Sequence, residues 1–224
     1  MSCKEASLFN FAYVFAGAGY FAYDESPVLG LRSSAWNGNE WFRQILQILD
    51  STISGETELL CFFAEDSSKY PMWCPYKGRG AATIEARLGY LWDTSKTAWG
   101  YMEKQKARGG NGVLIGISNG CIVAAELACW FPGIVSGLGF LSGSPSGEHL
   151  RRWEDDATQK PKHCVFSIGS QERYFGGPSG LQKIAESLNA DVVVKFEGDH
   201  CQESTSVLQH VITRLIEVSS LLQQ

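Results

Sequence analysis

Short apolar runs alternate with longer amphipathic segments along most of the chain. Runs of roughly four to eight apolar and β-branched residues bounded by turn residues predict strands. These runs show little alternation between apolar and polar positions, which is typical of parallel strands covered by helices on both faces. The six predicted strands are Leu8–Phe15, Glu58–Phe63, Val113–Ile115, Val135–Leu141, His163–Ile168 and Asp191–Phe196.

Helices are predicted between these runs, where apolar residues recur at helical spacing. Residues 142–162 are polar and are expected to form a loop with room for one short helix. Strands separated by helices predict an α/β fold of three layers, with a mostly parallel sheet of about six strands. With no internal repeat or linker, one domain over residues 1–224 is the simplest organisation. The predicted helices are Glu40–Leu49, Thr83–Ala107, Cys121–Trp130, Gly180–Leu188 and Ser204–Leu222.

The composition is that of an ordinary globular protein. The chain has 224 residues, of which 44% are hydrophobic and 19% charged, enough to bury a sizeable core. The formal net charge is −5, and no basic run is longer than Arg151-Arg152. This charge pattern argues against a nucleic-acid-binding protein.

The seven cysteines show neither disulfide-framework nor zinc-site spacing. Several of them stand in apolar runs and are predicted core residues, which favours a reducing, cytoplasmic location. The apolar stretch Leu8–Tyr23 is too short to span a bilayer as a helix, and it is interpreted as the strand Leu8–Phe15 with the glycine loop that follows rather than as a signal peptide. The glycines at 17–19 lack both the GxGxxG spacing and a P-loop lysine, so no metal or nucleotide cofactor is expected.

The most informative segment is Gly116–Gly120, which fits the pattern Gly-x-Ser-x-Gly. It follows an apolar run and precedes an apolar helical segment, which is the strand–turn–helix context of a nucleophile elbow. The serine of such a turn has a strained backbone, and the two glycines let strand and helix approach closely. Ser118 is therefore the candidate nucleophile, with the amino end of the helix favouring negative charge that develops beside it.

An elbow serine needs a histidine as base and a carboxylate that orients the histidine. With this elbow the order along the chain is serine, acid, histidine. His200 directly follows the last predicted strand and is the candidate base. His210 falls on the surface of the last predicted helix and is the weaker candidate.

The acid is expected just after the strand His163–Ile168, and Glu172 is the first carboxylate there. Asp155 and Asp156, which follow the preceding strand, remain alternatives. Asp199 adjoins His200 and is poorly placed to reach its ring.

Two backbone N–H groups are needed to form an oxyanion hole. One is expected from Asn119, which follows the nucleophile, and the other from Ala18 in the glycine loop after the first strand. Aromatic residues in segments that leave the carboxyl ends of strands are candidates for lining an apolar substrate site. The chosen substrate-binding candidates are Tyr20, Trp73 and Tyr174.

Four short motifs, which follow one another along the chain, give it a resemblance to the α/β-hydrolase superfamily. It looks most like the small serine hydrolases, namely the fungal-type serine hydrolases and their phospholipase/carboxylesterase relatives. That family commonly has His where this chain has Ala16, Gln where it has Asn119 and Asp where it has Glu172. The segments that carry the resemblance are Phe15–Gly19, Gly116–Gly120, Gly169–Glu172 and Gly198–His200.

The resemblance implies a serine hydrolase that cleaves a small-molecule carboxylic ester or thioester. Ser118 would form an acyl-enzyme, His200 would transfer the proton, and Glu172 would hold the histidine tautomer. Two alternatives stay open: an acyltransferase or trans-acylating thioesterase with the same nucleophile, and a catalytically silent binding module of this fold. Acyl chain length, the leaving group and the oligomeric state have no signature in the sequence.

Overall fold

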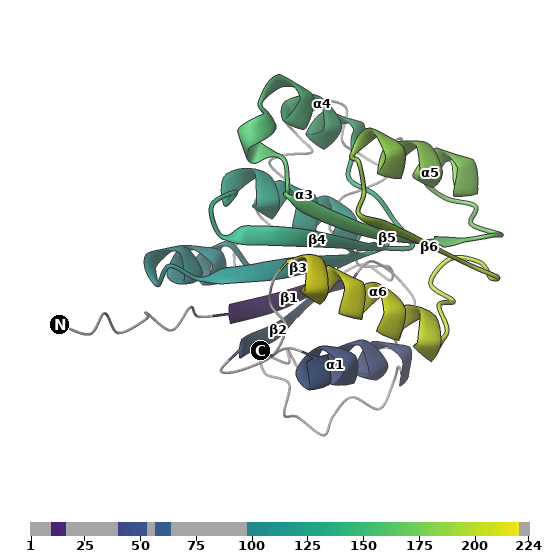
Figure 1. The fold of residues 1–224 in the computed structure, drawn as a ribbon, viewed down its shortest axis with the longest axis horizontal. Coiled ribbons are helices and arrows are strands. Elements are labelled where there is room, and N and C mark those ends of the chain that lie inside the picture. The colour runs from purple at the N-terminus through teal and green to yellow at the C-terminus, as the bar shows by residue number, and fades with distance from the viewer. Residues whose placement is uncertain (1–9, 17–39, 53–56, 64–97, 220–224) are drawn as a thin grey trace.

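A computed structural model describes residues 10–16, 40–52, 57–63 and 98–219 (Figure 1). Its strands and helices alternate along the chain, and residues 98–107 are helical as well. The elements are β1 (Asn10–Ala16), α1 (Glu40–Thr52), β2 (Thr57–Phe63), β3 (Asn111–Ile117), α3 (Gly120–Trp130), β4 (Val135–Leu141), α4 (Gly147–Asp155), the 3₁₀ turn Ala157–Gln159, β5 (His163–Gly169), α5 (Gly177–Ser187), β6 (Val192–Phe196) and α6 (Thr205–Val218).

These strands form a six-stranded sheet in the order β2-β1-β3-β4-β5-β6. Every pair of neighbours is parallel, so the prediction of a mostly parallel sheet of about six strands is confirmed. Because the strands are parallel, the segments that follow β3, β4, β5 and β6 all start at the same edge of the sheet.

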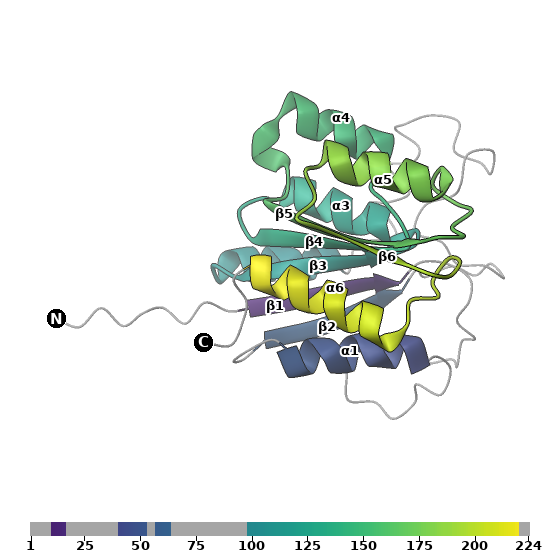
Figure 2. The same ribbon diagram turned by 45° about the vertical axis from the view of Figure 1, so that its right-hand side comes forward.

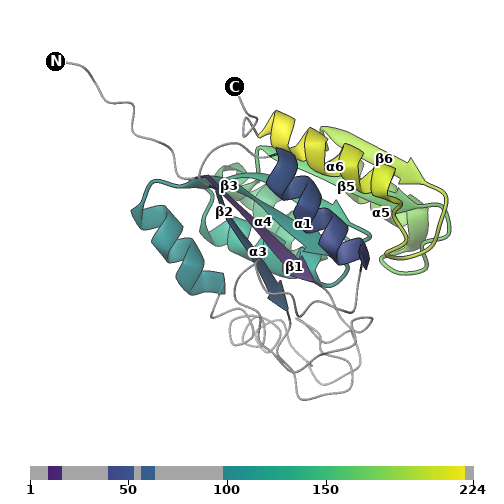
Figure 3. The ribbon, with the colours of Figure 1, turned by 90° about the horizontal axis from the view of Figure 1, so that it is seen from below.

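Helices cover both faces of the sheet, giving the three predicted layers (Figure 2). Alternate residues of β1 point to opposite faces, as the two-residue period of a strand requires. Phe11 and Tyr13 join the core under α3, α4, α5 and residues 98–107. Ala12 and Val14 join the core under α1 and α6, which lie side by side on the second face (Figure 3).

The α6 helix shows why these segments are helical. Its buried residues recur at intervals of three and four positions and form one apolar stripe against the sheet. The hydroxyl of Ser204 accepts a hydrogen bond from the amide of Val207 and caps the first turn. The buried stripe consists of Leu208, Val211, Ile212, Leu215 and Ile216.

Residues 142–162, expected to form a loop with room for one short helix, do contain a short helix, because nine of these residues form α4. The hydroxyl of Ser146 and the side chain of His149 make a reciprocal capping box at its start. Trp153, with 3% of its surface exposed, anchors the helix in the core. Capping and one large apolar anchor therefore stabilise a short helix whose residues are mostly polar.

A polar cluster ties α4 to α3. The Nε2 atom of His149 lies 2.7 Å from Glu126 Oε2, and Nη1 of Arg152 lies 2.9 Å from the same oxygen. The indole of Trp130 donates to Glu126 Oε1 at 2.6 Å. Burial by itself raises the pKa of Glu126, but the hydrogen bonds from His149 and Trp130 and the charge of Arg152 outweigh burial and lower it to about 2. The cluster thus keeps a half-buried carboxylate ionised between two helices.

Candidate active site

The turn between β3 and α3 has the geometry predicted for a nucleophile elbow. Ser118 has a φ of +53°, in the left-handed region that residues other than glycine rarely adopt. A Cβ atom at Gly116 would overlap the backbone of Cys121, and one at Gly120 would overlap the backbone of Phe15. The amide of Ser118 donates to the carbonyl oxygen of the last residue of β4 at 2.9 Å. The motif glycines are thus required by close packing, and the adjacent strand holds the strained serine.

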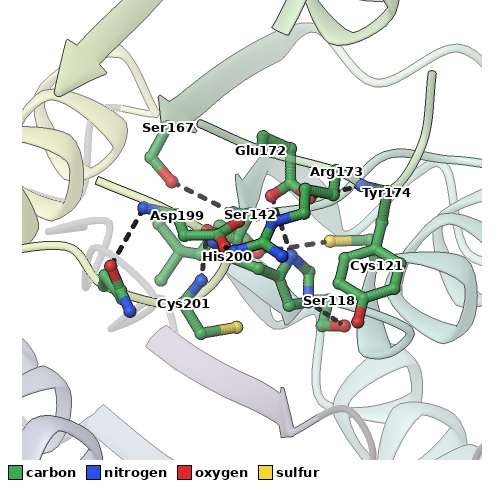
Figure 4. A network of polar contacts seen from close by, with 12 residues as sticks. Ser118, Cys121, Ser142, Ser167, Glu172, Arg173, Tyr174, Asp199, His200 and Cys201 are labelled. Carbon is green, nitrogen blue, oxygen red and sulfur yellow. Dashed lines mark hydrogen bonds and ion pairs between the residues drawn. The ribbon is translucent and has the colours of Figure 1, made fainter. Parts of the chain in front are cut away.

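His200 lies in the loop between β6 and α6, called here the histidine loop (residues 197–203). Its Nε2 atom is 2.7 Å from Ser118 Oγ (Figure 4). Its backbone amide donates to Asp199 Oδ1 at 2.8 Å. The described structure therefore brings together the predicted serine and histidine, which are 82 residues apart in the chain.

Glu172 lies in the loop between β5 and α5, called here the acid loop (residues 170–176). Its Oε2 atom is 2.8 Å from His200 Nδ1, and its side chain has no exposed surface. The other oxygen accepts from the amide of Tyr174 at 2.8 Å. Nδ1 of His200 therefore faces the buried carboxylate, while Nε2 faces the serine hydroxyl.

The acid loop and the histidine loop run side by side. The amide of Ser170 donates to the carbonyl of Phe196, and that of Gln171 to the carbonyl of Gly198, both at 2.9 Å. At the surface, Arg173 Nη2 lies 2.6 Å from Asp199 Oδ2. These contacts fix the distance between the glutamate and the histidine.

Two aromatic rings flank the imidazole of His200. The Tyr174 ring meets it edge-on with centroids 4.7 Å apart, and the Phe175 ring lies nearly parallel to it at 6.1 Å. Phe175 has a φ of +53°, so the acid loop is strained at the residue that stacks on the histidine. Tyr174 is 46% exposed and presents apolar surface beside the candidate base His200.

The other carboxylates considered as the acid have positions and hydrogen-bond partners different from those of Glu172. Asp156 accepts from the amide and hydroxyl of Thr158 and from Gln159, while Asp155 is exposed near the end of α4. Asp199 accepts from the backbone of His200. Hydrogen bonding to that amide, with a further contribution from Arg173, holds the pKa of Asp199 below its usual range.

The remaining predicted site residues divide by position. Asn119 is the first residue after Ser118 and stands at the amino end of α3, where the amides of the first turn point out of the helix. Tyr174 borders the site, and His210 is exposed on α6 as expected. Ala18, Tyr20 and Trp73 lie outside the described residues.

A buried polar network below the histidine loop was not predicted. Glu203 Oε1 accepts hydrogen bonds from the hydroxyls of Ser142 and Ser167 at 2.8 and 2.6 Å. Burial raises the pKa of Glu203, although both hydroxyl groups oppose that shift. The three residues are far apart in the sequence, and the one available signal was a glutamate three positions after the candidate histidine.

Within the described ranges, no three His, Cys, Asp or Glu side chains are grouped so that they could hold a metal ion. Nor does any helix of these ranges combine the length and apolarity that a membrane span requires. Cys121, Cys129 and Cys164 are buried free thiols, as predicted for core cysteines.

Comparisons with known proteins give matches in structure but not in sequence. No family model matches the chain, and no curated protein matches it. The solved structures that resemble it include an esterase named PE8, with a TM-score of 0.63 and 14% identity over 94% of this chain and 93% of the other. This resemblance extends over nearly the whole length of both chains.

Two further matches come from a plant and a bacterium. Acyl-protein thioesterase 2 of Zea mays has a TM-score of 0.61 and 12% identity, over 98% of this chain and 97% of the other. A carboxylesterase of Bacillus cereus has a TM-score of 0.61 and 16% identity, over 96% and 91%. The chain has the α/β-hydrolase fold. In this α/β-hydrolase fold the candidate serine, acid and histidine follow β3, β5 and β6 in chain order.

Proposed function

We propose that this protein is a serine hydrolase that cleaves a carboxylic ester or thioester. The observation that carries the proposal is the unbroken hydrogen-bonded series from Ser118 through His200 to Glu172, with the serine on a strained turn. A serine, its base and an orienting acid in this arrangement are the parts that nucleophilic acyl transfer needs. The esterase, thioesterase and carboxylesterase that share the fold support the same class of reaction.

The reaction begins with proton transfer from Ser118 Oγ to His200 Nε2 while the oxygen attacks the substrate carbonyl. The carbonyl oxygen becomes negatively charged in the tetrahedral intermediate. The amide of Asn119, together with a second amide proposed at Ala18, donates to this oxygen. The amino end of α3 adds a favourable dipole at the same point.

His200 then returns the proton to the leaving alcohol or thiol, and the acyl group stays on Ser118. Water, deprotonated by the same histidine, attacks the acyl-enzyme; His200 then returns this proton to Ser118 Oγ as the bond to the acyl group breaks and the acid leaves. Glu172 holds the proton of His200 at Nδ1 throughout and stabilises the imidazolium that forms twice in each cycle. Its full burial strengthens this interaction, because water does not screen it.

The substrate is proposed to be a small acyl ester or thioester, and Tyr174, Tyr20 and Trp73 are the proposed apolar contacts. Tyr174 lies against the ring of His200, so it would touch the substrate close to the bond that is cleaved. We also propose a cytoplasmic location, on the basis of the cysteine pattern of the sequence.

The deciding experiment is labelling with a fluorophosphonate probe and peptide mapping, with a series of p-nitrophenyl esters assayed alongside. We expect covalent modification at Ser118 that is lost on heat denaturation, and turnover of at least one ester. Labelling without turnover, with acyl transfer to an added thiol or alcohol, would instead favour the transferase. A folded sample that neither labels nor turns over would indicate a binding module.

A further inference from the structure

A buried carboxylate lies below the loop that carries the candidate base. Glu203 is 3% exposed, and its Oε1 atom accepts from both Ser142 Oγ and Ser167 Oγ. Ser142 directly follows β4, and Ser167 belongs to β5. One carboxylate oxygen therefore joins the ends of two neighbouring strands to the histidine loop.

Ser142 passes this connection to the residue next to the base. Its hydroxyl donates to Glu203 and accepts from the amide of Cys201 at 2.9 Å. Its own amide donates to Ser167 Oγ at 3.1 Å. A serine hydroxyl has one proton, so donating it to Glu203 turns the lone pairs towards the Cys201 amide. Glu203 thus orients the group that holds the backbone directly after His200.

The backbone at Ser142 and Cys201 is strained and needs stabilising contacts. Cys201 has a φ of +54° and Ser142 a φ of +45°, both in the left-handed region that non-glycine residues rarely adopt. Such conformations persist only where the surrounding contacts outweigh their strain. The carbonyl of Leu141, the residue before Ser142, accepts from the amide of Ser118. The same corner of β4 is therefore bonded to the nucleophile and to the residue after the base.

The contacts on the outer side of the loop are of a different kind. Asp199 accepts from the amide of His200, but its partner Arg173 has 78% of its side chain exposed. Exposed ion pairs contribute little because water and salt screen them. The buried network is the firmer of the two holds, since its hydrogen bonds among Ser142, Ser167 and Glu203 are buried and the bond from Cys201 is partly buried.

We propose that Glu203, acting through Ser142, is a positioning residue that sets the distance between His200 and Ser118. The kinetic part of this inference rests on the proposed function, because the position of His200 affects a rate only if it acts as a base. The inference also predicts a property of the unreacted protein, namely a strong hydrogen bond from His200 Nδ1 to Glu172 that depends on the network.

The test compares Ser142→Ala with Ser144→Ala. Ser144 is also buried after β4, but its hydroxyl bonds the adjacent Pro145 carbonyl. We expect Ser142→Ala to lower kcat by about 10- to 100-fold with KM changed less than about threefold, because a small displacement of a catalytic group has effects of this size. Ser144→Ala is expected to keep the wild-type kcat. Both are assayed well below their melting temperatures.

Glu203→Gln supplies the conservative variant. The side-chain amide oxygen of this variant can accept hydrogen bonds from the hydroxyls of Ser142 and Ser167, so kcat is expected to lie within about threefold of the wild-type value. Glu203→Leu removes the acceptor and should match Ser142→Ala. If Glu203→Gln is as impaired as Ser142→Ala, the charge and not the acceptor is required, and the positioning role is wrong.

Proton NMR separates this inference from the proposed function, because it needs no substrate. The Nδ1 proton of His200 should give a downfield resonance in wild type, Ser144→Ala and Glu203→Gln, and shift or broaden in Ser142→Ala. That pattern supports the inference even if no ester is turned over. A Ser142→Ala protein with an unchanged Nδ1 resonance and unchanged kcat, altered only in melting temperature, would overturn it.

Discussion

Two series of hydrogen bonds in the described part of the molecule join a serine, a histidine and a glutamate. Their lengths are alike, at 2.7 and 2.8 Å in the first and 2.8 and 2.7 Å in the second, from serine to glutamate. They differ in the backbone conformation of the serine, in the histidine ring nitrogen that faces the serine, and in the hydrogen-bond partners of the glutamate carboxylate. They are the elbow chain, Ser118–His200–Glu172, and the helix chain, Ser146–His149–Glu126.

The backbone of the serine separates the two chains first. Ser118 stands at φ +53° on a tight turn, whereas Ser146 has the relaxed values φ −75° and ψ 159° of a helix N-cap. The Ser146 hydroxyl also accepts from the amide of His149, and Nδ1 of His149 accepts from the amide of Ser146. The hydroxyl oxygen of Ser146 therefore caps the first turn of α4.

The carboxylates differ as well. Glu126 is shared by His149, Arg152 and Trp130, so much of its charge is already balanced by a guanidinium. Glu172 bonds His200 and one backbone amide. The comparison teaches that the same three residue types at similar distances can stand in different settings: what sets the elbow chain apart is the strained turn at Ser118 and a carboxylate that no guanidinium shares.

The largest difference is expected from removing each serine. Ser118→Ala should lower kcat by at least about 10⁴-fold, because triad members act as a unit. Ser146→Ala should leave kcat unchanged and lower the free energy of unfolding by about 1 kcal/mol, the usual cost of a lost N-cap. Ester hydrolysis and denaturant unfolding measure both effects. Activity retained in Ser118→Ala would exclude the elbow chain as the catalytic group.

Replacing each glutamate should give the next largest contrast in rate. Glu172→Gln is expected to lower kcat by about 10²- to 10⁴-fold, because the amide does not stabilise the imidazolium. Glu126→Gln should keep a kcat close to wild type. A near-normal rate for Glu172→Gln would move the acid to another residue, and Asp155→Asn and Asp156→Asn would then be assayed.

The helix chain should instead affect how the free energy of unfolding depends on pH. The pKa of Glu126 is lowered from 4.5 to about 2 in the folded state. A lowered pKa stabilises the fold above the unfolded value, and this stabilisation is lost as the pH falls from about 4.5 towards 2. Glu126→Gln should thus have a lower free energy of unfolding than wild type at pH 7, and this difference should close through that window. A gap that is constant from pH 7 to 3 would contradict this ionisation.

The smallest effect is expected from the aromatic neighbour of each histidine. Tyr174 is half-exposed beside His200, whereas Trp153 is buried beside His149, with ring centroids 6.0 Å apart. Tyr174→Ala should raise KM about fivefold, equivalent to about 1 kcal/mol of lost substrate contact, with little change in kcat. Trp153→Phe should leave KM unchanged. Equal KM values in the Tyr174→Ala variant and wild type would place the substrate elsewhere.

Much of the fold followed from local signals. The strand β4 was predicted at its observed bounds, and β5 and α3 to within one residue, because Gly and Pro bound long apolar runs there. The elbow carries its own glycines, and the parallel sheet then brings Glu172 and His200 to the same edge. The prediction of one domain over residues 1–224 stays a prediction.

What the sequence missed depends on contacts between distant polar residues. Ser142 and Ser167 are 61 and 36 positions from Glu203, and each resembles an ordinary residue at a strand end. The short helix allowed between residues 142 and 162 was predicted without bounds, because the start of α4 depends on the capping contacts between the side chains of Ser146 and His149. Hydrophobic periodicity reports burial, and it does not report which polar groups share a buried hydrogen bond.

The spread of the site over three separate strand ends has a consequence for folding. During synthesis Ser118 emerges well before β6 and α6, so the growing chain carries the candidate serine without the candidate base. Parallel strands pair only across long crossovers, and contacts between such distant segments form slowly. Ser118 should therefore remain an ordinary hydroxyl until the last strand docks. The time at which a covalent probe begins to label Ser118 during refolding would then report when the whole sheet is complete.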